Sequence, residues 1–261
     1  MRAEVASVPT YPDLAGKVAV VTGGNKGIGA ATSRMLGAQG AAVVVVGRDP
    51  RSIAHVAGEI KEGGGRSLGV VADCLDFKAI EAMREQTEKE FGPTDILLAF
   101  AGGFGAYELT HEIAEEDWHA VIEGNLTTTF LTVKSFLPGM IDRKRGSIVT
   151  MASNAARFLD ILTTAPYAAS KAGIIMFSRH VAKEVGAHGV RINCVAPATV
   201  LSDRILRLMS ESRRAEVAAL SPLGRMGDPE DVARATLFLA SDASSWMTGV
   251  TLDVAGGRIM L

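Results

Sequence analysis

The run Val18-Ala-Val-Val-Thr-Gly-Gly-Asn-Lys-Gly-Ile-Gly29 determines the fold of this chain. A short β-branched stretch leads into a glycine-rich turn, and an amphipathic helical pattern follows. Gly23 permits a tight turn, Gly27 lets the backbone approach a pyrophosphate, and Gly29 allows the helix to pack closely on the strand. Free N–H groups at the start of the helix would then meet the phosphates, so the run predicts a dinucleotide site.

Working outward from this turn, six more short apolar runs alternate with helical patterns. They are Ala42–Val46, Ser67–Val71, Asp95–Phe100, Ser147–Met151, Arg191–Val195 and Thr251–Val254. Runs that are continuously apolar are typical of parallel strands covered on both faces. The alternation therefore predicts an α/β fold, a doubly wound, Rossmann-like parallel sheet of about seven strands with helices on both faces.

Length and composition narrow the class of protein. The 261 residues, 48% hydrophobic and 21% charged, suit one α/β domain with a sizeable core. Residues 1–14 are expected to form an N-terminal extension without the apolar run of a signal peptide, and residues 15–261 a single domain. The formal charge of −2 argues against nucleic-acid binding. The longest apolar run, Ala41–Val46, is far below the ~20 residues of a membrane helix.

The cysteines and histidines point to no metal or disulfide chemistry. Cys74 and Cys194 lie in apolar, strand-like surroundings, so we expect two small buried thiols and a cytoplasmic location. The five histidines offer no metal site, since His180 and His188 would stand ~12 Å apart along a helix.

The end of the second strand indicates which dinucleotide is bound. An NAD site usually has an acidic residue there for the ribose 2′-hydroxyl, but this chain has Gly47 followed by Arg48. A guanidinium can bind a 2′-phosphate through two parallel hydrogen bonds, and Lys26 adds a second cation from the turn. These residues favour NADP(H), although Asp49 could weaken the effect and both cations could simply be solvated.

A second motif, Tyr167-Ala-Ala-Ser-Lys171, opens a long helical pattern. Residues four apart share one helix face, so the lysine ammonium can act on the phenol. A free tyrosine has a pKa of about 10, too high for efficient proton transfer at neutral pH, and a nearby cation would lower it.

Together these motifs resemble the short-chain dehydrogenase/reductase family over about residues 15–258. The resemblance also includes Asp73, Ala101-Gly102, Asn125 and Ser153, and the segments Pro222–Ala233, Phe238–Asp242 and Thr248-Gly249 are similar to its carbonyl-reductase branch. It implies that Tyr167 is the general acid and that Ser153 hydrogen-bonds the substrate oxygen. Lys171 would hold the cofactor ribose and lower the pKa of Tyr167, and Asn125 would anchor a water that links Lys171 to solvent.

The resemblance likewise implies the cofactor contacts. Asp73 would meet the adenine ring and Val200 the nicotinamide carboxamide. The expected cofactor-binding residues are Gly23, Asn25, Lys26, Gly27, Ile28, Gly29, Arg48, Asp73, Ala101, Gly102, Tyr167, Lys171, Pro197, Val200 and Ser202.

The chain departs from the family pattern in several places. Ala99-Phe100 precedes Ala101-Gly102 where the family usually has Asn-Asn, which removes amide contacts that brace the sheet near the cofactor. The spacing from Ser153 to Tyr167 is one residue longer than the commonest, which implies a bulged loop. Smaller departures are Ala198 after Pro197, Ser202 in place of a common threonine, and Ala255 where an aspartate often precedes Gly-Gly.

Two segments are candidates for substrate contact. Residues 202–221 interleave arginines with apolar residues, which fits a substrate lid or an ordinary amphipathic surface helix. The other segment is the loop after Ser153. An apolar pocket, or equally core or subunit packing, would explain Phe158, Leu159, Ile161 and Leu162 of that loop together with Phe104, Tyr107, Ile205 and Met209.

The expected activity is NADP(H)-dependent interconversion of a ketone and a secondary alcohol, with a 3-oxoacyl thioester or a bulky apolar ketone as substrate. Arg143, Lys144 and Arg145 could receive the acidic surface of an acyl carrier, although a solvated basic turn explains them equally well. The alternatives are an alcohol or sugar dehydrogenase acting oxidatively and a catalytically silent NADP(H)-binding protein. Family relatives and the apolar C-terminal tail, which ends in Leu261, predict a homotetramer.

Overall fold

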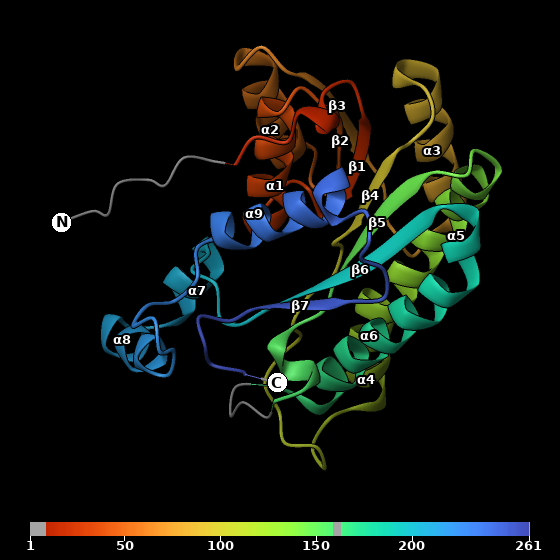
Figure 1. Cartoon of the computed structure of the whole chain (residues 1–261). Coiled ribbons are helices and arrows are strands. Elements are labelled where there is room, and N and C mark those ends of the chain that lie inside the picture. Colours follow the sequence, from red (N-terminus) through yellow and green to blue (C-terminus); the bar gives the residue numbers. More distant parts are fainter. Residues whose placement is uncertain (1–8, 159–162, 261) are drawn as a thin grey trace.

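The computed structural model describes residues 9–158 and 163–260 and places seven strands in one parallel sheet, in the order β3-β2-β1-β4-β5-β6-β7 (Figure 1). This confirms the doubly wound, Rossmann-like fold and the position of every predicted strand. The strands are β1 (Val18–Thr22), β2 (Ala42–Gly47), β3 (Arg66–Val71), β4 (Ile96–Ala99), β5 (Gly146–Met151), β6 (Val190–Pro197) and β7 (Thr251–Val254).

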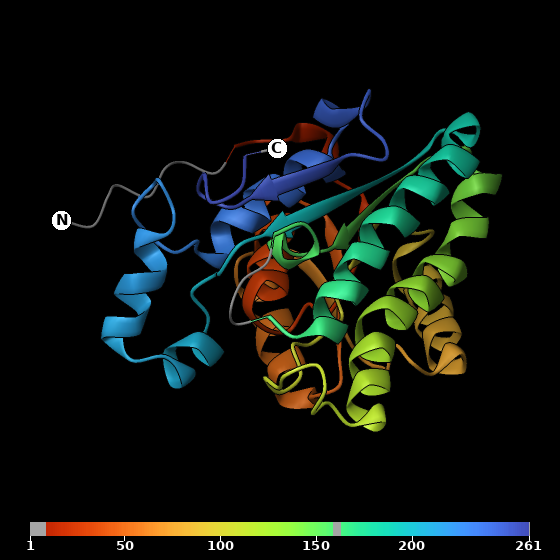
Figure 2. The ribbon, with the colours of Figure 1, turned by 90° about the horizontal axis from the view of Figure 1, so that it is seen from below.

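Helices cover both faces of the sheet. One face carries α1 (Gly27–Ala38), α2 (Pro50–Glu62) and α9 (Pro229–Ala240), and the other carries α3 (Phe77–Phe91), α5 (Thr128–Asp142) and α6 (Ala165–Val185), as Figure 2 shows from below. The remaining helices are α4 (Glu115–Ile122), which continues into α5, and α7 (Asp203–Leu208) and α8 (Glu211–Ala219).

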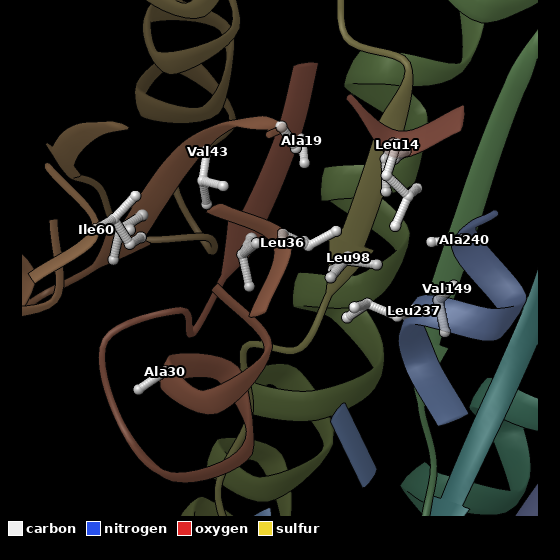
Figure 3. Close-up of a cluster of buried hydrophobic side chains, with 14 of the residues drawn as sticks. Leu14, Ala19, Ala30, Leu36, Val43, Ile60, Leu98, Val149, Leu237 and Ala240 are labelled. Atoms are coloured by element: carbon white, nitrogen blue, oxygen red, sulfur yellow. The ribbon is translucent and has the colours of Figure 1, made fainter. Parts of the chain in front are cut away.

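Alternate strand residues feed two apolar cores. In one of them Ala19, Val43 and Leu98 pack against Leu36 of α1 and Leu237 of α9 (Figure 3). The intervening residues point to the opposite face and meet α3, α5 and α6. Burying each valine or leucine contributes about 1.5–3 kcal/mol, so both faces of the sheet are held firmly by the helices. In sheets of this type, ligands bind at the loops that follow the carboxyl ends of the strands.

Two local predictions need correction. Strand β3 lies at the edge of the sheet, and its residues alternate between buried and exposed, with Val71 58% exposed. Between Trp118 and Met140 the spacing of Val121, Ile122, Leu126, Val133 and Leu137 in the sequence predicts one amphipathic helix. The structure has two helices there, because a π-helical turn over Glu123–Thr127 separates α4 from α5. Such turns insert one extra residue per turn and occur often at functional sites.

Candidate active site

The glycine-rich turn has the geometry that the sequence predicts. Gly23 adopts a φ of +67°, and a Cβ there would lie 3.0 Å from the Phe100 carbonyl oxygen. A Cβ on Gly29 would collide with the Gly23 carbonyl group. Among the described residues no side chain caps the start of α1, and the space beside Gly27 is open. The N–H groups of the first turn therefore remain available to an anion.

A cleft of about 890 Å³ follows the carboxyl ends of the strands from this turn to α4 and the start of α6. The predicted site residues in its lining are Gly23, Asn25, Lys26, Ile28, Gly29, Arg48, Asp73, Ala101, Gly102 and Asn125. Among the described residues, those that do not line it in this conformation are Gly27, Ser153, Tyr167, Lys171, Pro197, Val200 and Ser202. The cleft thus brings together the nucleotide half of the predicted site.

Gly47, at the end of β2, is packed under Asn25. A Cβ on Gly47 would meet the Asn25 side chain, with the amide carbon 2.7 Å away. The Asn25 amide is held there by a 2.7 Å hydrogen bond from Nδ2 to the Ser52 hydroxyl. Any side chain at position 47, acidic or not, would therefore have to displace the Asn25 amide from Ser52.

The three charged side chains beside Gly47 differ in their bonding. Lys26 lies 3.4 Å from Asp49, whose carboxylate also accepts hydrogen bonds from Ser52 and from the Arg51 backbone N–H. The Ser52 bond contributes most to holding the pKa of Asp49 below its usual value. Arg48 is exposed on the cleft wall and makes no ion pair with any described residue. Of the two cations, Arg48 is the one available to a 2′-phosphate.

The residues that follow β3 line another side of the cleft, where the sequence predicts the adenine contact. Asp73 is exposed there, and only its Oδ1 is bonded within the described residues, by the Leu75 backbone N–H at 3.0 Å. The adjacent Cys74 is buried, as predicted, and burial raises the pKa of its thiol to about 11.

The turn after β4 is braced despite the Ala99-Phe100 substitution. The Thr22 hydroxyl accepts hydrogen bonds from the Phe100 and Ala101 N–H groups at 3.1 and 3.2 Å and donates to the Leu98 carbonyl. Phe100 packs against the core beneath the sheet. Hydroxyl bonding and apolar contact therefore brace this turn without side-chain amides at residues 99 and 100.

Asn125 occupies the π-helical turn and binds the loop after β4. Its Nδ2 donates to the Gly103 and Val121 carbonyl oxygens, both at 2.8 Å, and its Oδ1 accepts from the Gly103 N–H at 3.2 Å. The side chain is 1% exposed, so this polar group in an apolar helix has found its partners. Asn125 joins α4 to the wall of the cleft.

Among the predicted site residues, Lys171 has a strongly shifted pKa. Its ammonium donates to the Met151 carbonyl oxygen at 2.9 Å and lies 5.5 Å from the centre of the Tyr167 ring. It is 4% exposed, and burial lowers its pKa to about 8. A Cβ on the neighbouring Gly102 would lie 2.6 Å from Asn125 Oδ1, so the glycine lets this part of the backbone pack against the Asn125 amide.

Tyr167 lies at the start of α6 with its ring against Phe104, the two ring centres 4.2 Å apart. Ser153 caps a short 3-10 turn after β5. Its hydroxyl accepts from the Ala155 N–H and donates to Asn154 Oδ1, both at 3.2 Å. The predicted general acid and its cation are thus in contact, and the Ser153 hydroxyl is engaged locally.

The three residues expected near the nicotinamide follow β6. Pro197 ends that strand, Val200 pairs with Gly227, and Ser202 caps α7 by accepting from the Ile205 N–H. Ala198, which replaces a usual glycine, donates its N–H to the Val254 carbonyl. Their contact with a cofactor stays a prediction.

The segment predicted as a lid or as one amphipathic helix forms the two short helices α7 and α8. They stand apart from the helices that cover the sheet in both views (Figures 1 and 2). Leu206 and Leu208 are 48% and 68% exposed. In the loop after Ser153, Phe158 is 46% exposed, while Leu159, Ile161 and Leu162 lie outside the described residues.

Sequence reasoning missed three contributors to the site. Ser52 fixes Asn25, Thr22 braces the β4 turn, and the Met151 carbonyl holds Lys171. Ser52 had a weak signal, because it stands three residues after the helix cap Asp49, where a serine can bond back to the cap. A backbone carbonyl leaves no trace in the sequence.

The comparisons with known proteins agree with this geometry. The family model described as enoyl-(acyl carrier protein) reductase matches residues 23–258. The chain is 35% identical over 246 residues to the 3-oxoacyl-[acyl-carrier-protein] reductase FabG of Escherichia coli (strain K12), covering 94% of this chain and 98% of that protein. It is 36% identical to the (2S)-[(R)-hydroxy(phenyl)methyl]succinyl-CoA dehydrogenase subunit BbsD of Thauera aromatica, covering 93% and 96%.

Solved structures give the same result. A 3-oxoacyl-[acyl-carrier protein] reductase from Brucella melitensis ATCC 23457 superposes with a TM-score of 0.93 at 30% identity, covering all of both chains. A short-chain type dehydrogenase/reductase from Mycobacterium marinum superposes with a TM-score of 0.88 at 31% identity, covering 96% of this chain and 98% of that one.

Proposed function

Because this chain belongs to the short-chain dehydrogenase/reductase family of oxidoreductases, we propose that it interconverts a ketone and a secondary alcohol with NADP(H) as the hydride carrier. The observation that carries the proposal is the buried Lys171 ammonium, held by the Met151 carbonyl beside the Tyr167 ring. Burying a lysine charge costs stability, and groups with such shifted pKa values cluster at functional sites.

The cleft residues fit a dinucleotide that carries a 2′-phosphate. The open, uncapped start of α1 would receive the pyrophosphate, and the exposed Arg48 guanidinium would pair with the 2′-phosphate. The second carboxylate oxygen of Asp73 would accept a hydrogen bond from the adenine amino group. When bound, NADPH supplies a hydride from C4 of its nicotinamide ring.

The chain's own residues would handle the proton and the charge. In the reducing direction Tyr167 would transfer its hydroxyl proton to the substrate oxygen. Ser153 would donate a second hydrogen bond to that oxygen, which requires its hydroxyl to turn away from Asn154. The Lys171 ammonium would stabilise the phenolate that remains on Tyr167. Asn125 would hold the adjoining loop and, as the family resemblance implies, a water on the path to solvent.

A 3-oxoacyl thioester is the substrate class that we propose first, in line with the names of the relatives. The basic turn that was expected to receive an acyl carrier is partly occupied, because Arg143 donates to the Thr94 carbonyl at 2.6 Å and Arg145 pairs with Asp95 at 3.1 Å. The turn also directly precedes β5, so it lies at the amino edge of the sheet, whereas the cleft lies at the carboxyl edge. The expectation that it receives the carrier is therefore wrong, and the turn does not favour an acyl carrier over coenzyme A. We therefore propose to test both carriers.

The proposed assembly is a homotetramer with two-fold axes. Phe130 of α5 and Met176 of α6 are 43% and 61% exposed, and near the C-terminus Trp246 and Met260 are 100% and 82% exposed. Two separate apolar surfaces of this kind suit two kinds of subunit contact. A monomer mass in sedimentation at micromolar protein would refute the tetramer.

In the described part of the chain, no helix is both long and apolar enough to cross a membrane. The buried free thiols of Cys74 and Cys194 are compatible with the reducing cytoplasm that we propose.

The decisive experiment follows NADPH oxidation spectrophotometrically with a 3-oxoacyl thioester on each carrier, an aryl ketone and a keto-sugar, with NADH in parallel. We expect turnover of at least one substrate and its loss in Tyr167→Phe, with cofactor affinity close to wild type. A Tyr167→Phe variant that keeps more than a few per cent of activity would exclude Tyr167 as the general acid. Tight NADPH binding without turnover would favour a silent nucleotide-binding protein.

A further inference from the structure

An aromatic ring from the loop after β4 lies directly on the proposed proton donor. The centres of the Phe104 and Tyr167 rings are 4.2 Å apart and their planes are inclined by 34°. Phe104 is only half-buried, so part of its ring remains accessible while it contacts Tyr167 at the start of α6. Phe104 itself neither lines the nucleotide cleft nor belongs to the four proposed catalytic residues.

The backbone on either side of Phe104 is fixed. Both the N–H and the carbonyl of Gly103 are bonded to the Asn125 side chain. Gly105 has a φ of +69°, and a Cβ there would lie 2.7 Å from Cγ2 of Val121 on α4, so only glycine lets the chain turn so close to that helix. Phe104 is thus held between two anchors, and its position on Tyr167 is set by the fold.

We propose that Phe104 is a specificity-determining residue that favours substrates with an aryl group on the carbonyl carbon. This inference rests on the proposed function, because it needs the substrate oxygen at the Tyr167 hydroxyl. An O–H···O bond of about 2.7 Å would then bring one substituent of the carbonyl carbon alongside the Phe104 ring. The neighbouring cleft has apolar lining residues close in sequence to both rings, namely Ala106 beside Phe104 and Pro166 beside Tyr167.

A planar aryl substituent gains more from this wall than a saturated one of equal size. Offset-stacked or edge-to-face rings attract each other through their quadrupoles beyond the burial of apolar area, and this extra attraction corresponds to about 2- to 10-fold in an equilibrium or rate ratio. A leucine in place of Phe104 would keep much of the apolar volume and remove the quadrupole.

The test compares 3-oxo-3-phenylpropanoyl and 3-oxo-3-cyclohexylpropanoyl thioesters, which differ in the aromaticity of one ring. The ratio of their kcat/KM values with NADPH is measured in the wild type and in Phe104→Leu, so that the intrinsic reactivities of the two ketones cancel. We expect the aryl preference to fall about 2- to 10-fold in Phe104→Leu and in Phe104→Met. Phe104→Tyr, which keeps the ring, is expected to stay within twofold of wild type.

Leu109→Ala is the matched control, since this side chain lies in the same loop, is 51% exposed and does not line the cleft. Its aryl preference should equal that of the wild type. Active Phe104→Leu and Phe104→Met variants with an unchanged ratio would overturn the inference and leave the proposed function intact. A wild-type enzyme that reduces another ketone of the panel but neither of these two would overturn this inference alone. NADPH binding without turnover of any ketone would refute the proposed function, and this inference with it.

Discussion

Reversing the cofactor preference tests how the end of β2 binds the ribose. The sequence alone suggests Gly47→Asp with Arg48→Ala, which replaces the partner of a 2′-phosphate by the partner of a 2′-hydroxyl. A Cβ on Gly47, however, meets the Asn25 amide, which Ser52 holds in place. The triple variant Asn25→Ala, Gly47→Asp, Arg48→Ala gives the new carboxylate its room.

The expected size of the change comes from two effects. Hydrogen bonds to charged groups contribute about 1.5–3 kcal/mol, and the exposure of Arg48 puts its bond to phosphate at the lower end. Loss of Arg48 should therefore lower kcat/KM for NADPH about tenfold and leave NADH nearly unchanged. The new carboxylate repels the 2′-phosphate of NADPH and binds the ribose 2′-hydroxyl of NADH. The ratio of kcat/KM for NADPH to kcat/KM for NADH should therefore fall about 100-fold in the triple variant.

The assay measures kcat/KM for both cofactors at low and at high ionic strength. We expect the double variant without Asn25→Ala to show a smaller shift, because the Asn25 side chain must first leave Ser52, at a cost of about 1 kcal/mol. Arg51→Ala is the control. It removes the same charge from an exposed residue that lies three positions after Arg48, in the first turn of α2. An unchanged ratio in the triple variant would mean that the 2′-phosphate binds elsewhere.

Three further perturbations follow from the site. Asp49→Asn should tighten NADPH binding severalfold while the helix cap survives, because it frees Lys26 from its 3.4 Å ion pair; weaker binding would contradict this. Thr22→Val leaves two N–H groups of the turn after β4 without a hydrogen bond. We therefore expect the free energy of unfolding, measured by thermal unfolding, to fall by about 1–3 kcal/mol and NADPH to dissociate more readily. Lys171→Met should end turnover yet raise the melting temperature of the cofactor-free protein by about 5 °C at pH 7. Burial lowers the pKa of Lys171 from 10.5 to about 8, so the buried charge destabilises the folded wild-type protein fully below pH 8. This destabilisation disappears as the pH rises towards 10.5, and with it the advantage of the Lys171→Met variant. A gain in stability that is independent of pH would refute this cause.

The fold was predictable because parallel strands leave a strong mark on the sequence. The β-branched run Val43 to Val46 is buried on both faces, as its sequence predicts for a central strand. The residues of the edge strand β3 alternate between buried and exposed, because only part of that strand is covered. The π-helical turn at Asn125 was not predictable from periodicity. One extra residue shifts a helical stripe by about 100°, and the apolar residues around it are dense enough to hide the shift.

The candidate site was predictable as a set of residue types and not as a set of contacts. Tyr167 and Lys171 are four apart on a helix, so their proximity follows from helix geometry. The bonds from Asn125 to Gly103 and from Lys171 to Met151 join segments far apart in sequence and end on backbone atoms. Such contacts depend on how the loops close over the sheet, which the local pattern does not encode.

The turn after β4 bears on whether the protein is an enzyme at all. The replacement of Asn-Asn by Ala99-Phe100 was the one feature that favoured a catalytically silent protein, because it removes amides near the cofactor. In the structure the Thr22 hydroxyl bonds the two N–H groups that follow β4, and the partly buried Phe100 packs against the core. A hydroxyl on β1 therefore holds two N–H groups of the turn, and the turn is braced without side-chain amides at residues 99 and 100. If Thr22→Val abolishes activity while NADPH still binds, the turn matters for chemistry itself; if activity and affinity fall together, its role is to shape the cofactor site.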